Sequence, residues 1–163
     1  LVIRAGRMIA DGLPAEYIAN RIKAMRSHVH ASFILDTMDF LAAGGRCPQI
    51  LAHVGSAIKM KPEIIVNNQD GSMHMGKIYR GKLERVLPNY VRDTIDRYPD
   101  IKCDDLFITH SGIDPELIEL VRKTVTECLD IERNHVTQAS CTISAHCGPN
   151  TLGILFVTDT PCE

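Results

Sequence analysis

The sequence predicts an α+β fold, in which helices pack on a largely antiparallel sheet. The dipeptide Asp70-Gly71 lies between two apolar segments and supplies the positive-φ residues of a tight hairpin turn. Short apolar runs at 32–36, 106–110 and 152–157 have the length of buried strands. Between these runs, apolar side chains recur three and four residues apart, which is the spacing of amphipathic helices. A hairpin, short strands and interspersed helices together predict the α+β class.

The chain begins with a segment that has the pattern of a helix already under way. Residues 1–11 are predicted to be helical, and no Ser, Thr, Asp or Asn precedes them to cap the first amides. Gly12 ends this helix and Pro14 opens a second one. We therefore expect a fragment, in which residues 1–28 are tail helices of a truncated upstream lobe and residues 29–163 form a C-terminal α+β lobe.

The next elements are predicted in the order strand, two short helices, hairpin. The strand at 32–36 is followed by helical spacing over 37–43, and a second short helix is expected over 50–58. The hairpin strands are expected at 61–67 and 72–79, on either side of the Asp-Gly turn. This part of the chain predicts the antiparallel pairing of the sheet.

The second half of the chain predicts two long helices and three strands. Apolar residues trace one helical stripe over 83–98, although Pro88 is expected to kink that helix. Asp114, followed by proline and glutamate, has the chemistry of a strong helix start. After this helix we expect strands at 136–144 and 152–157, separated by a turn that contains His146.

Composition excludes several classes of protein. The 163 residues are 45% hydrophobic and 23% charged, which is typical of a globular domain, and a net charge of −2 without a basic stripe argues against nucleic acid binding. The six cysteines include no CxxC pair. No apolar run is long enough to span a membrane, and no basic-then-apolar leader is present. We expect a cytoplasmic protein with free thiols.

The segment 141–157 carries the sharpest chemical signal. It places the imidazole of His146 beside Gly148 and Pro149, between apolar side chains. An imidazole can donate a charge-assisted hydrogen bond to a carboxylate, backbone amides of the turn can also point at a ligand, and the apolar neighbours can bury an attached chain. This chemistry suits fatty-acid capture, although a lone histidine in a turn is also often purely structural.

Three other sites deserve comparison with this one. A zinc site would recruit Cys141, His146 and Cys147, but no fourth ligand has suitable spacing, so no metal is expected. A thiol nucleophile at Cys147 lacks an orienting third group. The sequence Gly44-Gly45-Arg46 could bind an anion but lacks the lysine and hydroxyl of a P-loop. An ordinary helix C-terminus explains it equally well.

Five ordered motifs together resemble the second half of a DegV-family protein, and the resemblance covers nearly the whole chain. The motifs are Leu35-Asp-Thr-Met-Asp-Phe-Leu-Ala-Ala-Gly-Gly-Arg46, Val54-Gly-Ser-Ala-Ile-Lys-Met-Lys-Pro62, Asp70-Gly71, Lys77-Ile-Tyr-Arg-Gly-Lys82 and His146-Cys-Gly-Pro-Asn-Thr-Leu-Gly153.

The resemblance implies the second lobe of a two-lobe, bacterial fatty-acid-binding carrier. Such a protein presents a long-chain fatty acid to a separate fatty acid kinase, is not itself the catalyst and needs no cofactor. By this resemblance His146 and Gly148 belong to the lipid site, and the other head-group contacts, hydroxyls of the first lobe, lie upstream of this chain. Arg46 is a candidate for docking the kinase.

The chain departs from the family pattern at two positions. Cys47 stands where a β-branched aliphatic residue is more familiar, and Asn150 where glycine is common. Two other interpretations of the sequence stay open. One is a small cytosolic enzyme, either a thiol hydrolase using Cys147 or a phosphotransferase using the Gly-Gly-Arg turn. The other is an interaction module that takes no ligand.

Overall fold

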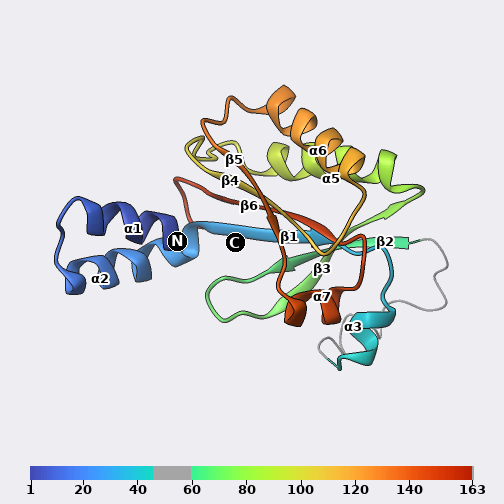
Figure 1. Cartoon of the computed structure of the whole chain (residues 1–163), viewed down its shortest axis with the longest axis horizontal. Helices are drawn as coiled ribbons and strands as arrows, with labels where there is room; N and C mark the ends of the chain where they lie inside the picture. The colour runs from blue at the N-terminus through green and yellow to red at the C-terminus, as the bar shows by residue number, and fades with distance from the viewer. Residues whose placement is uncertain (46–59, 163) are drawn as a thin grey trace.

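The computed structural model describes residues 1–45 and 60–162 (Figure 1). The predicted helix at 50–58 and the candidate docking residue Arg46 lie outside these ranges. The elements run in the order α1 (Val2–Ala10), α2 (Ala15–Met25), the short 3-10 helix η1 (Arg26–His28), β1 (Val29–Ile34), α3 (Asp39–Ala43), β2 (Met60–Val66), β3 (Met73–Arg80), α5 (Leu83–Arg97), β4 (Leu106–His110), α6 (Pro115–Cys128), β5 (Asn134–Gln138), α7 (Cys141–Cys147) and β6 (Leu152–Val157).

The strands form one six-stranded sheet in the order β3-β2-β1-β6-β4-β5. Every neighbouring pair is antiparallel except β4 and β5, which run parallel. The predicted α+β class with a largely antiparallel sheet is therefore confirmed. Helix α6 connects the parallel pair, as parallel strands require a crossover connection.

Helices α5 and α6 lie together on one face of the sheet, and α3 and α7 lie on the other side (Figure 1). The side chains between the sheet and the α5–α6 layer form the main hydrophobic core. This core includes Ile34, Leu106, Ile108 and Ile154 from the sheet, all fully buried. Helix α5 is continuous through Pro88, which is itself buried in this layer.

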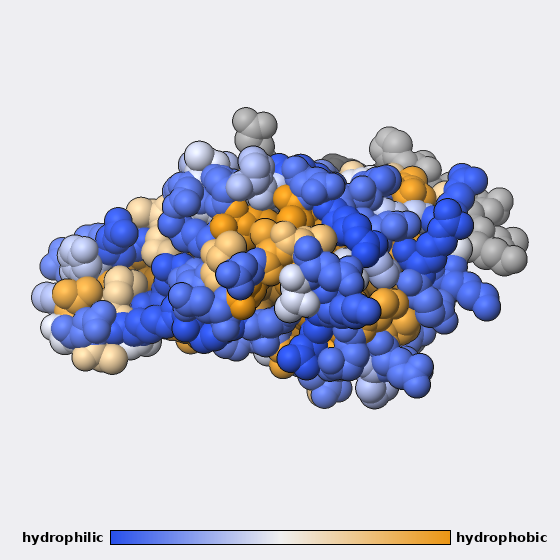
Figure 2. All heavy atoms as spheres, turned by 90° about the horizontal axis from the view of Figure 1, so that it is seen from above, coloured by the Kyte–Doolittle hydropathy of each residue, from blue (hydrophilic) through white to orange (hydrophobic). Residues whose placement is uncertain are grey.

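The surface above the α5–α6 layer is shown in Figure 2. An apolar area in the middle of this face is bordered by hydrophilic side chains. The α1–α2 pair projects from one end of the body, at the left in Figures 1 and 2. None of the α1 residues is buried, and α2 buries only Ile18. The division of the chain near residue 28 stays a prediction.

The β2–β3 hairpin confirms the prediction made from Asp70-Gly71, with Gly71 at φ +78°. An ion pair between a buried carboxylate and a partly exposed arginine fixes this hairpin to α5. The fully buried Glu63 accepts hydrogen bonds from Arg97 at 3.2 and 3.1 Å and from the backbone amide of Lys77 at 3.1 Å. The strand register shifts beside Glu63, and Gly76 leaves room for its carboxylate.

The prediction of a strand over 136–144 is wrong in its second half. Strand β5 ends at Gln138, and α7 begins two residues after Ala139. The Ser140 hydroxyl accepts a hydrogen bond from the amide of Ile143 at 3.4 Å and so caps the new helix. His146 consequently lies in the last turn of a helix and not in a turn between two strands.

Candidate functional site

Among the described elements, one face of the sheet has no long helix on it (Figure 1). Along β1, side chains alternate between the α5–α6 core and this second face, which we call the open face. Ala31 on β1 pairs with Leu155 on β6, which in turn pairs with Phe107 on β4. All three side chains are only partly buried. Neighbouring strands thus present a row of apolar side chains at the centre of the open face.

Two pockets lie on the open face, and Leu155 lines both of them. The first, which we call the α1 pocket, has a volume of about 290 Å³ and lies between the start of α1 and the sheet. Its apolar lining comes from Leu1, Val2 and Ile3 on one side and from the strands on the other. The pockets share a lining residue, so they adjoin along the apolar row.

The second pocket, which we call the α7 pocket, has a volume of about 190 Å³. Its walls are apolar over most of their extent, and its polar residues come from β1, from the end of β4 and from the start of β6. The lining residues are Ala31, Ser32, Phe33, Val66, Thr109, His110, Ser111, Ala139, Ile143, Cys147, Thr151, Gly153 and Leu155.

His146 lies at the contact between α7 and α3. A Cβ added to Gly44 would be 2.4 Å from the Nδ1 atom of His146, so the imidazole rests against the backbone at the end of α3. Its helix neighbours Ile143 and Cys147 line the α7 pocket, whereas His146 does not. The structure therefore places His146 beside this pocket, partly buried, and outside its wall.

Gly148 ends α7 in a conformation that favours glycine. Its φ is +77°, and its amide donates to the carbonyl of Ser144 at 2.8 Å. A Cβ at this position would lie 2.4 Å from the ring of Phe40 on α3. Because its amide is used inside α7, the expectation that this amide points at a ligand does not hold for Gly148. Its role in the structure is to let α3 and α7 approach closely.

Asn150 takes φ +60° in the turn between α7 and β6. Its side-chain amide donates to Asp36 Oδ2 at 3.1 Å, and Asp36 also forms an ion pair with Lys61. The backbone amide of Asn150 donates to the carbonyl of Gly112 at 3.0 Å. The turn is therefore held by the residues that follow β1 and by the loop that follows β4, and asparagine provides a contact that glycine could not.

His110 lines the α7 pocket and was not among the site residues predicted from the sequence. It ends β4, and its Nδ1 accepts a hydrogen bond from the amide of Gly112 at 3.3 Å. Because His110 pairs with the core residue Leu152, the alternation along β4 directs its side chain to the α5–α6 side of the sheet and not to the open face.

The comparisons with known proteins agree on one family. The DegV family model, described as uncharacterised, matches residues 1–159. The chain belongs to the DegV family. A DegV domain-containing protein of Caldanaerobacter subterraneus is 28% identical over 158 residues, which are 96% of this chain and 54% of that protein. The chain thus spans about half the length of the curated relatives it matches.

Solved structures, among them DegV-family proteins, share the fold of the chain. A Thermus thermophilus protein, described by its fatty acid binding, is 21% identical with a TM-score of 0.81, over 96% of this chain and 55% of that one. The Fatty Acid Kinase (Fak) B3 protein of Streptococcus pneumoniae, loaded with linoleic acid, is 14% identical with a TM-score of 0.82, over 97% and 54% of the two chains.

The alternative chemistries have little support in the described parts of this DegV-family chain. No group of three or more potential metal ligands occurs within residues 1–45 and 60–162. Cys147 and His146 are adjacent on a helix, so their side chains point in different directions. Gly45 has φ +61° at the end of α3, which is the helix C-terminus expected there, and the anion-binding alternative depends on Arg46, outside the described ranges. Among the described helices, none is long and apolar enough to cross a membrane.

Proposed function

We propose that this chain forms one wall of a fatty-acid site and that the complete protein carries a long-chain fatty acid to a fatty acid kinase. The observation that carries this proposal is the pair of adjoining apolar pockets along the open face. Solved structures with the same fold that are described as fatty-acid-binding or fatty-acid-loaded support it. In this proposal the protein is a carrier and the kinase is the catalyst.

The acyl chain would supply most of the affinity. Burial contributes about 0.8 kcal/mol per methylene, so about fifteen carbons contribute on the order of 10 kcal/mol before ordering costs. A hydrogen bond to a charged group contributes only roughly 1.5–3 kcal/mol. An apolar surface on one lobe can therefore supply much of the binding free energy once a second surface covers the acyl chain. Polar contacts then fix the orientation of the head group.

His146 would orient the carboxylate at the α7 end of this surface. His146 does not line the α7 pocket, but its helix neighbours Ile143 and Cys147 do, so the head group of the ligand would extend beyond the pocket wall toward the imidazole. Gly148 would contribute by holding α7 against α3. Arg46 follows Gly45 at the end of α3, and we propose that it contacts the kinase near the exposed head group.

The proposal is tested on the complete protein by extracting co-purified lipid and identifying it by mass spectrometry. We expect a long-chain fatty acid. The His146→Ala variant should bind free fatty acid roughly tenfold more weakly, as expected for the loss of one charge-assisted hydrogen bond, and kinase-dependent phosphorylation should fall.

The matched control is His74→Ala, because His74 is exposed on β3 and lines neither pocket. It should retain wild-type binding. Unchanged acyl-chain retention together with unchanged phosphorylation in His146→Ala would contradict the assignment of His146. The absence of any co-purified lipid, with no binding of added fatty acid, would contradict the carrier function itself.

A further inference from the structure

The two pockets of the open face follow one another along the strands. On β1 the α1 pocket is lined by Val29 and the α7 pocket by Ala31, two residues further along the strand. On β4 the same step separates Phe107 in the α1 pocket from Thr109 in the α7 pocket. Because residues two apart on a strand point to the same face, the two pockets lie end to end on one side of the sheet.

The α7 pocket is deepest over Gly153 on the central strand β6. Gly153 has no side chain, and its partners on the neighbouring strands, Phe33 and Thr109, line the pocket beside it. A Cβ at Gly153 would be 2.4 Å from the carbonyl oxygen of Ser32, so no larger residue fits without a shift of the backbone. The middle of this pocket is therefore open down to the backbone of β6.

Leu155 is the next residue of β6 on the same face, and its side chain is large. It pairs with Ala31 and Phe107 and lines both pockets. Val157, the residue that follows on this face, lines only the α1 pocket. The Leu155 side chain thus stands between the space over Gly153 and the α1 pocket.

The volumes limit how many carbons each pocket can hold. An apolar cavity of about 150 Å³ holds one benzene molecule, which corresponds to roughly 25 Å³ per carbon. At this ratio the α7 pocket, of about 190 Å³, holds about eight carbons, and the α1 pocket, of about 290 Å³, holds about twelve. Neither pocket alone holds an acyl chain as long as palmitate, whereas the two together do.

We propose that the two pockets form one acyl channel, in which the chain passes over Leu155 from the α7 pocket into the α1 pocket, and that Leu155 controls which chain lengths are bound. This inference rests on the proposed function. With the head group at the α7 end, the first carbons fill the α7 pocket and the later carbons of a long chain fill the α1 pocket. Octanoate ends before Leu155, so its affinity does not depend on that side chain.

Tryptophan at position 155 distinguishes the two parts of the channel, because it fills the passage and leaves the space over Gly153 free. We expect the delipidated complete protein with Leu155→Trp to bind palmitate at least about a hundredfold more weakly. Each buried methylene is worth about fourfold in affinity, and the blocked chain loses about four or more of them. Octanoate should bind within about threefold of wild type. Titration calorimetry measures both affinities.

Two further variants control for position and folding. Val157→Trp fills the α1 pocket beyond Leu155 and should weaken palmitate binding while leaving octanoate binding unchanged. Ile78→Trp places the same side chain on β3, outside both pockets, and should bind both acids as the wild type does. Circular dichroism verifies folding. If Leu155→Trp does not fold, the result for Val157→Trp decides the inference.

Normal palmitate binding by folded Leu155→Trp would overturn the inference, because the acyl chain would then not pass this residue. So would an equal loss for octanoate and palmitate, which would show damage to the α7 pocket and not a blocked passage. If the wild-type complete protein binds neither acid, the proposed function fails as a whole. If it binds palmitate and the tryptophan variants bind it equally well, only the path of the acyl chain fails.

Discussion

His30 is a titratable side chain enclosed in the hydrophobic core. It is 2% exposed, its ring stacks on Phe156 with centroids 4.7 Å apart, and its Nε2 is hydrogen-bonded to Ser32 at 2.9 Å. Burial, together with the smaller effect of the nearby positive charge of Arg97, lowers the pKa of His30 from 6.5 to about 3. At pH 6.5, at which an exposed imidazole would be half protonated, the folded protein therefore keeps this ring neutral.

The neutral His30 predicts that folding stability falls as the solution is acidified from pH 7 to 5. The unfolded chain binds a proton below about pH 6.5, whereas the folded chain does not until about pH 3, so stability is full above pH 6.5 and decreases below it. This one group should remove about 2 kcal/mol between pH 7 and 5. Urea unfolding at both pH values measures the change.

The control for this prediction separates the buried ring from other histidines. His30→Gln is expected to lower the stability at pH 7 but to flatten its dependence on pH. His74→Gln removes an exposed histidine and should leave the slope as in the wild type. An unchanged slope in His30→Gln would contradict the assignment of the pH dependence to the core.

Elements of this fold could be predicted from the sequence where local chemistry decides them. The hairpin follows from the Asp70-Gly71 turn, and the start of α6 from Asp114, whose carboxylate accepts the amide of Glu116 at 2.9 Å. Helix α7 could not be predicted from local chemistry in this way. It has seven residues, and its close packing depends on Gly44, which is far away in the sequence.

The candidate site was predictable to a similar extent. Five ordered motifs, of which one contains His146, identified the family, because the order of motifs can be recognised without knowledge of contacts. The wall of the α7 pocket was not predictable, since it combines side chains from β1, β2, β4, α7 and β6.

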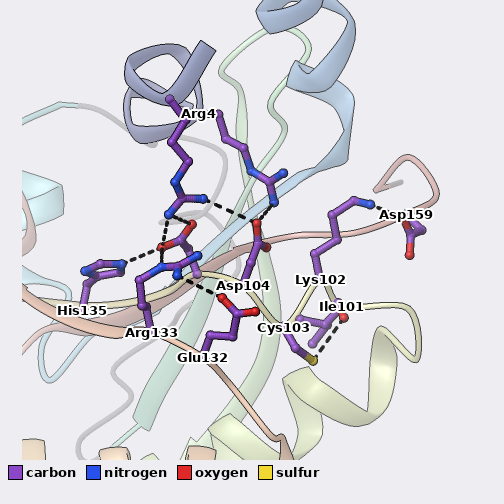
Figure 3. A network of polar contacts seen from close by, with 11 residues as sticks. Arg4, Ile101, Lys102, Cys103, Asp104, Glu132, Arg133, His135 and Asp159 are labelled. Carbon is purple, nitrogen blue, oxygen red and sulfur yellow. Dashed lines mark hydrogen bonds and ion pairs between the residues drawn. The ribbon is translucent and has the colours of Figure 1, made fainter. Parts of the chain in front are cut away.

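Helix α1 is attached to the sheet by charged side chains (Figure 3). Arg4 pairs with Asp104, while Asp105 accepts hydrogen bonds from Arg7 at 3.0 Å, from Arg133 at 3.0 Å and from His135 at 2.8 Å. Burial opposes the charged form of Asp105, but these hydrogen bonds outweigh it and lower the pKa of its carboxyl to about 2. The network fixes one wall of the α1 pocket.

Replacing this carboxylate should loosen α1 selectively. We expect Asp105→Asn to lower the free energy of unfolding by on the order of 2 kcal/mol, because hydrogen bonds to a charged acceptor are among the stronger ones. Amide hydrogen exchange should accelerate in residues 2–10 and stay slow in β6. The exposed pair of Asp159 with Lys102 provides the control, since Asp159→Asn should change little. Equal protection of α1 in both variants would contradict the prediction.

At the scale of the whole molecule, the two faces of the sheet are unequal. The α5–α6 face is closed by a continuous core, whereas the open face carries two adjoining apolar pockets that meet at Leu155. Contiguous apolar surface of this kind marks interaction or ligand sites in proteins generally. The charged α1 network and the α3–α7 contact support this surface from its two ends.

The open face should bind the hydrophobic dye ANS when the 163-residue chain is studied by itself. We expect Leu155→Asp to reduce dye fluorescence by about half or more, because a carboxylate would then stand where the two pockets adjoin. Ile78→Asp is the matched control, since Ile78 is a partly exposed apolar residue on β3 that lines neither pocket. Far-UV circular dichroism would verify that both variants are folded. Equal dye binding by the two folded variants would show that the open face is not the main surface that binds the dye.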